Sequence, residues 1–257
     1  MKLPIKLIST DFDGTLHSDF EVPPVPVALK DLLARLQSGG VKWVVNTGRD
    51  LSGLLEGMAR AGLTVQPDYI VAVERELYEH REDAYLPVTA WNHRCQQEHA
   101  VVFAQLRRDL PELTRWVHER FTATVYEDPY SPFCLLAGNN RDTDQVQEYL
   151  ENYCRQVPHL AVVRNDVYLR FCHQSFNKGS ALTEIARLVG VSRREVFAVG
   201  DHFNDLPMLN TECAAWLAAP ANAMPEVRNT VNRQGGFVSS RPCGSGVLEA
   251  LEKALKG

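Results

Sequence analysis

The residues most able to do chemistry lie together near the start of the chain, in the stretch Asp-Phe-Asp-Gly-Thr-Leu at positions 11–16. An apolar run precedes it (Leu3, Ile5, Leu7, Ile8) and reads as a buried strand. Side chains alternate between the two faces of a strand, so Asp11 and Asp13 would point the same way. Gly14 then allows a sharp turn. The pattern predicts a site in which Asp11 is a nucleophile, Asp13 is its acid–base partner and a divalent cation holds the acids.

The elements around this stretch alternate in a regular way. Apolar patterns predict strands at 5–10, 41–45 and 69–73, with helices at 27–38 and 51–61 between them. Such alternation predicts a parallel sheet with helices on both faces and right-handed connections. Ligands in such sheets bind beyond the carboxyl ends of the strands. Asp11 and Thr47 both follow a predicted strand, so we expect them at the same edge.

The pattern changes after a short hairpin predicted at 76–88 and resumes at Asn177. The section between them reads as helices and antiparallel strands, and Asp142 or Thr143 is expected to cap its last helix. Beyond Asn177, a helix over 178–189 and a strand over 196–199 restore the parallel alternation. We therefore expect one core formed by residues 1–86 and 175–257, interrupted by a separate α/β insert at 87–174.

The composition excludes several classes of protein. The 257 residues are 45% hydrophobic and 23% charged, as in an ordinary globular chain that can bury a large core. A net charge of −5 argues against nucleic acid as a partner, but a small anionic substrate needs only a few local cations. The six cysteines are widely spaced and indicate neither a zinc site nor a redox pair. No apolar run is long enough for a signal peptide or a membrane span, so a cytoplasmic protein without a membrane partner is expected.

Four motifs in order carry a resemblance to a known family. They are Asp-Phe-Asp-Gly-Thr at 11–15, Thr47 after the second strand, Lys178, and Gly-Asp-His-Phe-Asn-Asp at 200–205. Together they resemble the haloacid dehalogenase (HAD) superfamily, and the resemblance covers essentially the whole chain. The insert resembles the C2-type cap. The Thr47-Gly48-Arg49 sequence and the Lys-Gly-Ser-Ala-Leu sequence that begins at Lys178 resemble the Cof-like, sucrose-phosphatase-like subgroup.

The resemblance implies an α/β fold, with a Rossmann-like parallel-sheet core and an inserted α/β cap domain. It also implies a Mg²⁺-dependent phosphatase that hydrolyses a small phosphorylated metabolite, with a sugar phosphate as the expected substrate. Asp11 would attack phosphorus and form an aspartyl-phosphate, while Asp13 would protonate the leaving oxygen and then deprotonate water. The cation would be held by Asp11, Asp201 and the backbone carbonyl of Asp13.

The remaining motif residues are implied to handle the phosphoryl group. The phosphate-binding residues would be Thr47, Gly48, Lys178 and Asn204, with Lys178 supplying a fixed positive charge. Asp205 would orient Lys178 and the water around the metal.

Two other functions stay open at this point. A phosphomutase of sugar phosphates would use the same acids but would need more cations in the insert, which holds several arginines but only one or two candidates in strands. A non-catalytic regulatory protein on the same fold is disfavoured by the intact acids at 11, 13 and 201.

Several residues near the motifs have less certain roles. Arg49 could pair with a carboxylate or contact the substrate, and His17 and His202 are expected to be solvated loop residues. Glu74-Arg75-Glu76 stands where many relatives have a glycine-containing turn, which could alter the floor of the substrate pocket.

Overall fold

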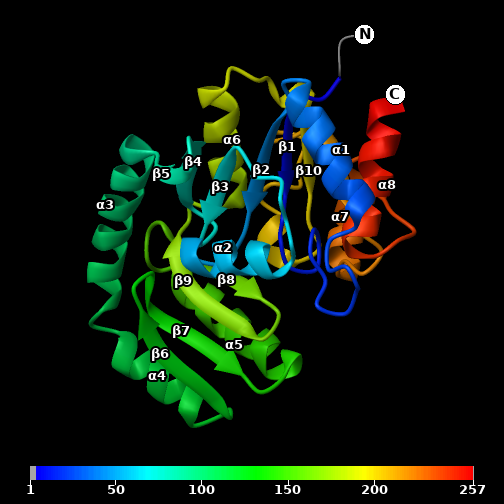
Figure 1. The fold of residues 1–257 in the computed structure, drawn as a ribbon. Helices are drawn as coiled ribbons and strands as arrows, with labels where there is room; N and C mark the ends of the chain where they lie inside the picture. Colours follow the sequence, from blue (N-terminus) through cyan, green and yellow to red (C-terminus); the bar gives the residue numbers. More distant parts are fainter. Residues whose placement is uncertain (1–3, 257) are drawn as a thin grey trace. The chain divides into compact units, whose positions relative to one another are not determined.

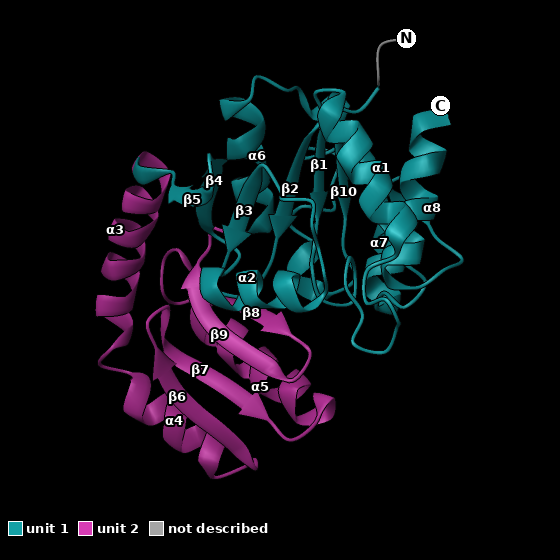
Figure 2. Ribbon diagram, in the orientation of Figure 1, with its two compact units in different colours: residues 1–89, 178–257 teal, residues 90–177 magenta. Residues whose placement is uncertain are grey.

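The computed structural model describes residues 4–256, so Leu3 of the predicted apolar run lies outside the described residues. The chain forms two compact units, which Figure 2 shows in different colours. One comprises residues 1–89 and 178–257, and the other comprises residues 90–177. The boundaries between the units thus follow Thr89 and Asn177, slightly later in the chain than the predicted boundaries after residues 86 and 174.

The first unit is built on an eight-stranded sheet in the order β12-β11-β10-β1-β2-β3-β4-β5. Its strands are β1 (Leu7–Thr10), β2 (Lys42–Asn46), β3 (Tyr69–Ala72), β4 (Glu76–Arg81), β5 (Ala84–Pro87), β10 (Val196–Val199), β11 (Trp216–Ala219) and β12 (Phe237–Val238). The strands from β12 to β3 are parallel, while β4 and β5 add an antiparallel hairpin. The predicted α/β fold class with a parallel core sheet is therefore confirmed.

Strand β1 occupies the centre of this sheet and pairs with β10 on one side and β2 on the other. All four of its residues are buried, as expected for a parallel strand covered on both faces. The chain leaves β1 toward β2, whereas β10 continues away from it toward β11. The connections therefore diverge at the carboxyl ends of β1 and β10, and this divergence is where an open α/β sheet forms its ligand crevice.

Helices cover both faces of this sheet (Figure 1). In this unit they are α1 (Val27–Ser38), α2 (Leu51–Arg60), α6 (Lys178–Leu188), α7 (Pro225–Arg233) and α8 (Cys243–Lys256). Helices α1, α2 and α8 share one hydrophobic cluster with the sheet, which includes Leu33, Trp43 and Leu251. Helix α6 lies behind the sheet in the view of Figure 1. Among the described residues, no helix is both long and apolar enough to cross a membrane.

The second unit has a four-stranded antiparallel sheet in the order β6-β7-β9-β8. Its elements are α3 (Thr89–Leu106), which starts one residue before the boundary, α4 (Leu110–His118), β6 (Ala123–Asp128), β7 (Ser131–Ala137), α5 (Asn140–Cys154), β8 (Leu160–Asn165) and β9 (Tyr168–His173). Alternate strand residues such as Phe133, Leu135 and Phe171 pack with the three helices in one core.

The predicted cap of α5 is wrong. Its N-cap is Asn139, whose side chain accepts a hydrogen bond from the backbone N–H of Asp142, rather than Asp142 or Thr143.

Helix α6 begins in close contact with the loop that follows β10. A Cβ atom on Gly179 would lie 2.1 Å from the carbonyl oxygen of Pro207, a distance that real structures do not tolerate. Because the obstacle is backbone rather than a flexible side chain, only glycine allows the helix start to approach this loop so closely. Gly179 therefore determines how near Lys178 comes to the residues after β10.

We predict that Gly179→Ala lowers the free energy of unfolding by about 1–3 kcal/mol, because the added methyl must push α6 away from Pro207. Gly138→Ala is the matched control, since a Cβ there would meet only Thr122 at an ordinary 3.5 Å. Urea unfolding measures both variants. Wild-type stability in Gly179→Ala would contradict the account of this contact.

Candidate active site

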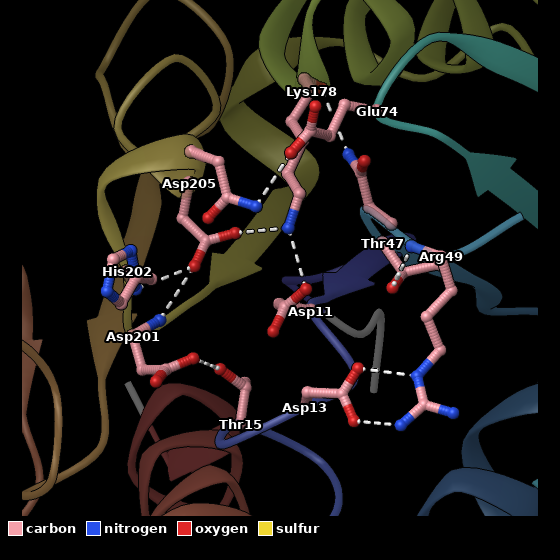
Figure 3. A network of polar contacts seen from close by, with 12 residues as sticks. Asp11, Asp13, Thr15, Thr47, Arg49, Glu74, Lys178, Asp201, His202 and Asp205 are labelled. Atoms are coloured by element: carbon pink, nitrogen blue, oxygen red, sulfur yellow. Dashed lines mark hydrogen bonds and ion pairs between the residues drawn. The ribbon is translucent and has the colours of Figure 1, made fainter. Parts of the chain in front are cut away.

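Sequence-predicted residues from four parts of the chain gather at the carboxyl edge of the parallel strands (Figure 3). Asp11 directly follows β1, Thr47 follows β2 and Asp201 lies two residues beyond β10. Lys178 is the first residue of α6 and directly follows the last residue of the second unit, Asn177. Because β1 and β10 are neighbours in the sheet, their terminal loops bring Asp11 and Asp201 together.

Lys178 lies at the centre of this arrangement and is completely buried. Its Nζ donates a hydrogen bond to Oδ1 of Asp11 at 2.6 Å and another to Oδ1 of Asp205 at 2.7 Å. Burial by itself lowers the pKa of Lys178, but the nearby charges of Asp11, Asp205 and Glu74 outweigh it, and the net pKa is raised. Lys178 is therefore a fixed ammonium at any physiological pH.

Three carboxylates surround this single cation. One oxygen from each of Asp11, Asp201 and Asp205 lies within 4.8 Å of the other two. Burial, reinforced by the neighbouring carboxylates, raises the pKa of Asp11 well above its usual value despite the lowering effect of Lys178. Burial likewise raises the pKa of Asp201 to about 7, with the charge of Asp205 as the next cause. Full ionisation of the three carboxyl groups would therefore leave more negative charge than Lys178 can balance.

This donor set fits a hard divalent cation. Carboxylate oxygens are the ligands that Mg²⁺ prefers in proteins, and a double positive charge would compensate the excess of acids. The predicted metal-holding side chains Asp11 and Asp201 both belong to the cluster. The predicted contribution of Asp13, through its backbone carbonyl, stays a prediction.

Asp205 acts as a brace within the cluster. Its Oδ1 accepts from Lys178, while its Oδ2 accepts from the backbone N–H groups of Asp201 at 2.8 Å and His202 at 2.9 Å. Both oxygens are thus already engaged by the protein. Asp205 thereby holds the loop of Asp201 against Lys178, and its expected role toward the water around a metal stays a prediction.

Two further hydrogen bonds hold the loop after β1 in place. The hydroxyl of Thr15 donates to Oδ1 of Asp201 at 2.7 Å, and the side chain of Asn222 donates to the carbonyl oxygen of Gly14 at 2.8 Å. Asn222 belongs to none of the four sequence motifs. Its position in a distant loop gave no local signal, because the contact depends on the fold.

Asp13 lies apart from the carboxylate cluster and forms a two-pronged ion pair with Arg49. Nε of Arg49 donates to Oδ2 at 2.7 Å and Nη2 donates to Oδ1 at 2.6 Å. The guanidinium also lies 5.3 Å from the ring centroid of Phe12, and its hydrogen bond to Asp13 is the main reason its pKa is raised. Of the two roles that the sequence left open for Arg49, the structure shows the carboxylate pair.

His17 is not the solvated loop residue that the sequence suggested. It is only 7% exposed and stacks on the ring of Phe12 with a centroid distance of 5.0 Å. The reason is a tight turn, in which the backbone N–H groups of Leu16 and His17 both donate to the carbonyl of Phe12. His202 is half-buried, and its backbone N–H donates to Oδ2 of Asp205.

The remaining predicted phosphate-binding residues lie beside the cluster. Thr47 is buried, and its hydroxyl oxygen accepts from the backbone N–H of Arg49 at 3.2 Å. Nδ2 of Asn204 donates to Oε1 of Glu74 at 2.8 Å. A Cβ on Gly48 would lie 3.3 Å from the same Glu74 oxygen, so this part of the site is tightly packed. Contact of these groups with a phosphate stays a prediction.

Comparison with known proteins identifies the family. The model of the haloacid dehalogenase-like hydrolases matches residues 113–251, which is more than half of the chain. The chain belongs to the haloacid dehalogenase-like hydrolases. It is 32% identical to an HMP-PP phosphatase of Escherichia coli O157:H7, an alignment that covers 87% of this chain and 86% of the relative. Bacillus subtilis YxeH is 26% identical, with 89% and 92% covered.

The fold of this hydrolase also matches solved structures. The sucrose-phosphatase of Synechocystis, solved with sucrose and phosphate, superposes with a TM-score of 0.72 over 98% of each chain at 19% identity. The prediction of a HAD-type fold is confirmed, and the predicted enzyme class, a phosphatase, agrees with the family and with its relatives.

The raised pKa of Asp201 in this HAD hydrolase predicts how Asp201→Asn changes stability as a function of pH. A carboxyl whose folded pKa is raised to about 7 costs stability progressively as pH rises from its ordinary value of 3.8, because the unfolded chain ionises first. Asparagine removes that cost and can still accept from Thr15. In metal-free buffer, the variant should therefore gain stability relative to wild type between pH values of about 4 and about 7.

Urea unfolding with a chelator measures this difference, and Glu212→Gln at an 84% exposed side chain is the control. Added Mg²⁺ should then raise the stability of wild type and leave Asp201→Asn unchanged. A constant difference across the pH range, or an equal response to Mg²⁺, would contradict the charge account.

Proposed function

We propose that this protein is a Mg²⁺-dependent phosphatase that hydrolyses a small phosphorylated metabolite through an aspartyl-phosphate on Asp11. The observation that carries this proposal is the position of Asp11 between the buried Lys178 ammonium and the carboxylate of Asp201. Phosphoryl transfer requires charge neutralisation and in-line positioning, and this cluster supports both.

Asp11 is the proposed nucleophile. Lys178 holds its Oδ1, which orients the carboxylate and leaves Oδ2 for attack on phosphorus. When bound by Asp11, Asp201 and the backbone carbonyl of Asp13, Mg²⁺ would supply positive charge that offsets the repulsion between Asp11 and a phosphate.

Asp13 is the proposed acid–base residue. Its side chain is 42% exposed, and Arg49 engages both of its oxygens in an ion pair that must loosen before one of them can carry the proton. In the first half-reaction Asp13 would protonate the leaving oxygen, and in the second it would take a proton from the attacking water. Arg49 acts through Asp13 by controlling its orientation.

Contacts to the transferring phosphoryl group are proposed for Thr47, Gly48, Asn204 and Lys178. Thr47 and Asn204 offer neutral donors, the backbone N–H of Gly48 is a further donor, and Lys178 supplies the fixed charge. The support for these roles is the location of Thr47 and Lys178 beside Asp11 (Figure 3), with Gly48 and Asn204 both close to the Glu74 carboxylate.

The proposed substrate class is a sugar phosphate, and the second unit (residues 90–177) is proposed to supply the residues that select it. The likeness in fold to a sucrose-phosphatase supports a sugar phosphate, and the name of the HMP-PP phosphatase relative gives a second substrate class to test. Phosphate release across a panel of sugar phosphates, phosphorylated acids and nucleotides tests the class. The highest kcat/KM is expected for a sugar phosphate, and a clear preference for a nucleotide would refute that assignment.

The nucleophile assignment makes a direct prediction. Asp11→Asn should lower turnover of 4-nitrophenyl phosphate by roughly 10⁴-fold or more, because an amide cannot attack phosphorus. Asp31→Asn, at an exposed position on α1, is the matched control and should keep wild-type turnover. Colorimetric rates measure both variants.

EDTA should also abolish wild-type turnover, and excess Mg²⁺ should restore it. Activity that persists in Asp11→Asn would refute the nucleophile, and turnover in EDTA would refute the metal requirement.

A further inference from the structure

The turn after β3 has an unusual backbone. Val73 and Glu74 have φ angles of 44° and 66°, in the left-handed region that favours glycine. For a β-branched residue such as Val73 this conformation is a true outlier, and each such residue costs of order 1–3 kcal/mol. Strain of this kind persists only where surrounding contacts enforce it.

Two backbone hydrogen bonds join this turn to the predicted phosphate-binding loop. The N–H of Val73 donates to the carbonyl of Arg49 at 2.8 Å, and the N–H of Glu74 donates to the carbonyl of Thr47 at 2.9 Å. These two carbonyls flank Gly48 on either side. The strained turn is therefore anchored to the one loop that supplies Thr47 and Gly48.

The same backbone conformation directs the Glu74 side chain into the site (Figure 3). Glu74 is only 4% exposed, and its Oε1 accepts from Nδ2 of Asn204 at 2.8 Å. Its charge is also among the causes that raise the pKa of Lys178. A buried carboxylate thus lies among three of the proposed phosphate-binding residues, Gly48, Lys178 and Asn204.

A carboxylate in this position is poorly suited to contact a phosphate, because the two anions repel each other. It is well suited to accept a hydrogen bond from an amide. The outer torsion of an asparagine side chain is otherwise broad, so an unanchored amide would have to be ordered when substrate binds. The bond to Glu74 fixes the plane of the Asn204 amide in advance.

We infer that Glu74 is a positioning residue that holds the Asn204 amide in the orientation that binds the phosphoryl group. This inference rests on the proposed function for the identity of the bound group. It assigns a role to Glu74 in the turn after β3. The backbone strain at Val73 and Glu74 is, on this view, the cost of placing an acceptor beside Asn204.

The test compares Glu74→Ala with Glu74→Gln, which keeps an oxygen that can accept from Asn204. Glu74→Ala should raise KM for 4-nitrophenyl phosphate about tenfold and change kcat by less than about twofold, because ground-state and transition-state binding weaken together. Glu74→Gln should restore most of the KM. Glu79→Ala, which removes a partly exposed acid of β4, is the control, and thermal unfolding checks that every variant is folded.

A double-variant cycle with Asn204→Ala shows whether Glu74 acts through Asn204. In the Asn204→Ala background, Glu74→Ala should have almost no further effect on KM. Additive effects, a wild-type KM in Glu74→Ala, or a Glu74→Gln variant as impaired as Glu74→Ala would each overturn the inference.

Calorimetry with inorganic phosphate and Mg²⁺ separates this inference from the proposed reaction, because it needs no turnover. Performed on the Asp11→Asn protein, it should show about tenfold weaker phosphate binding when Glu74→Ala is added. If the enzyme fails to hydrolyse any phosphate ester but this loss appears, the reaction is wrong and the role of Glu74 stands. Unchanged phosphate affinity would overturn the role of Glu74 even in an active phosphatase.

Discussion

The ammonium of Lys178 is the interaction on which the rest of the site depends. It is fully buried and is held by the carboxylates of Asp11 and Asp205. Removing a charged amine from water costs several kcal/mol, and a buried ion pair rarely returns more than that as net stability. We interpret the arrangement as a functional one: Lys178 fixes the direction of Asp11 and links the loop after β1 to the loop after β10 through Asp205.

The geometry of the fold makes this ion pair possible. Lys178 reaches Asp11 because α6 starts against the backbone of Pro207, an approach that only Gly179 permits. The pair still leaves the acids in excess, and burial, reinforced by these neighbouring carboxylates, raises the pKa values of Asp11 and Asp201. The same imbalance that destabilises the metal-free site would favour a divalent cation there, so one electrostatic constraint connects packing, stability and proposed chemistry.

The parts that the sequence could predict follow from short-range rules. Apolar periodicity predicted the parallel strands, and the rule that ligands bind at strand ends placed Asp11 and Thr47 at one edge of the sheet. Lys178 was added to this site by the resemblance of the four motifs to the HAD superfamily. The ion pair between Arg49 and Asp13 was only one of two alternatives, because a long flexible side chain has many rotamers. The contact of Glu74 could not be foreseen at all. It depends on a left-handed turn without glycine, which no local pattern predicts.

The central claim is that Asp11 carries the phosphoryl group during turnover. Acid quenching of the enzyme during steady-state turnover of a radiolabelled phosphate ester, followed by peptide mapping with mass spectrometry, tests it most directly. The account predicts a labile phosphoryl group on the peptide that contains Asp11, attached to Asp11 and to no other residue of that peptide. A phosphoryl group at a different residue, or full turnover with no covalent intermediate under conditions that trap acyl phosphates, would contradict the account.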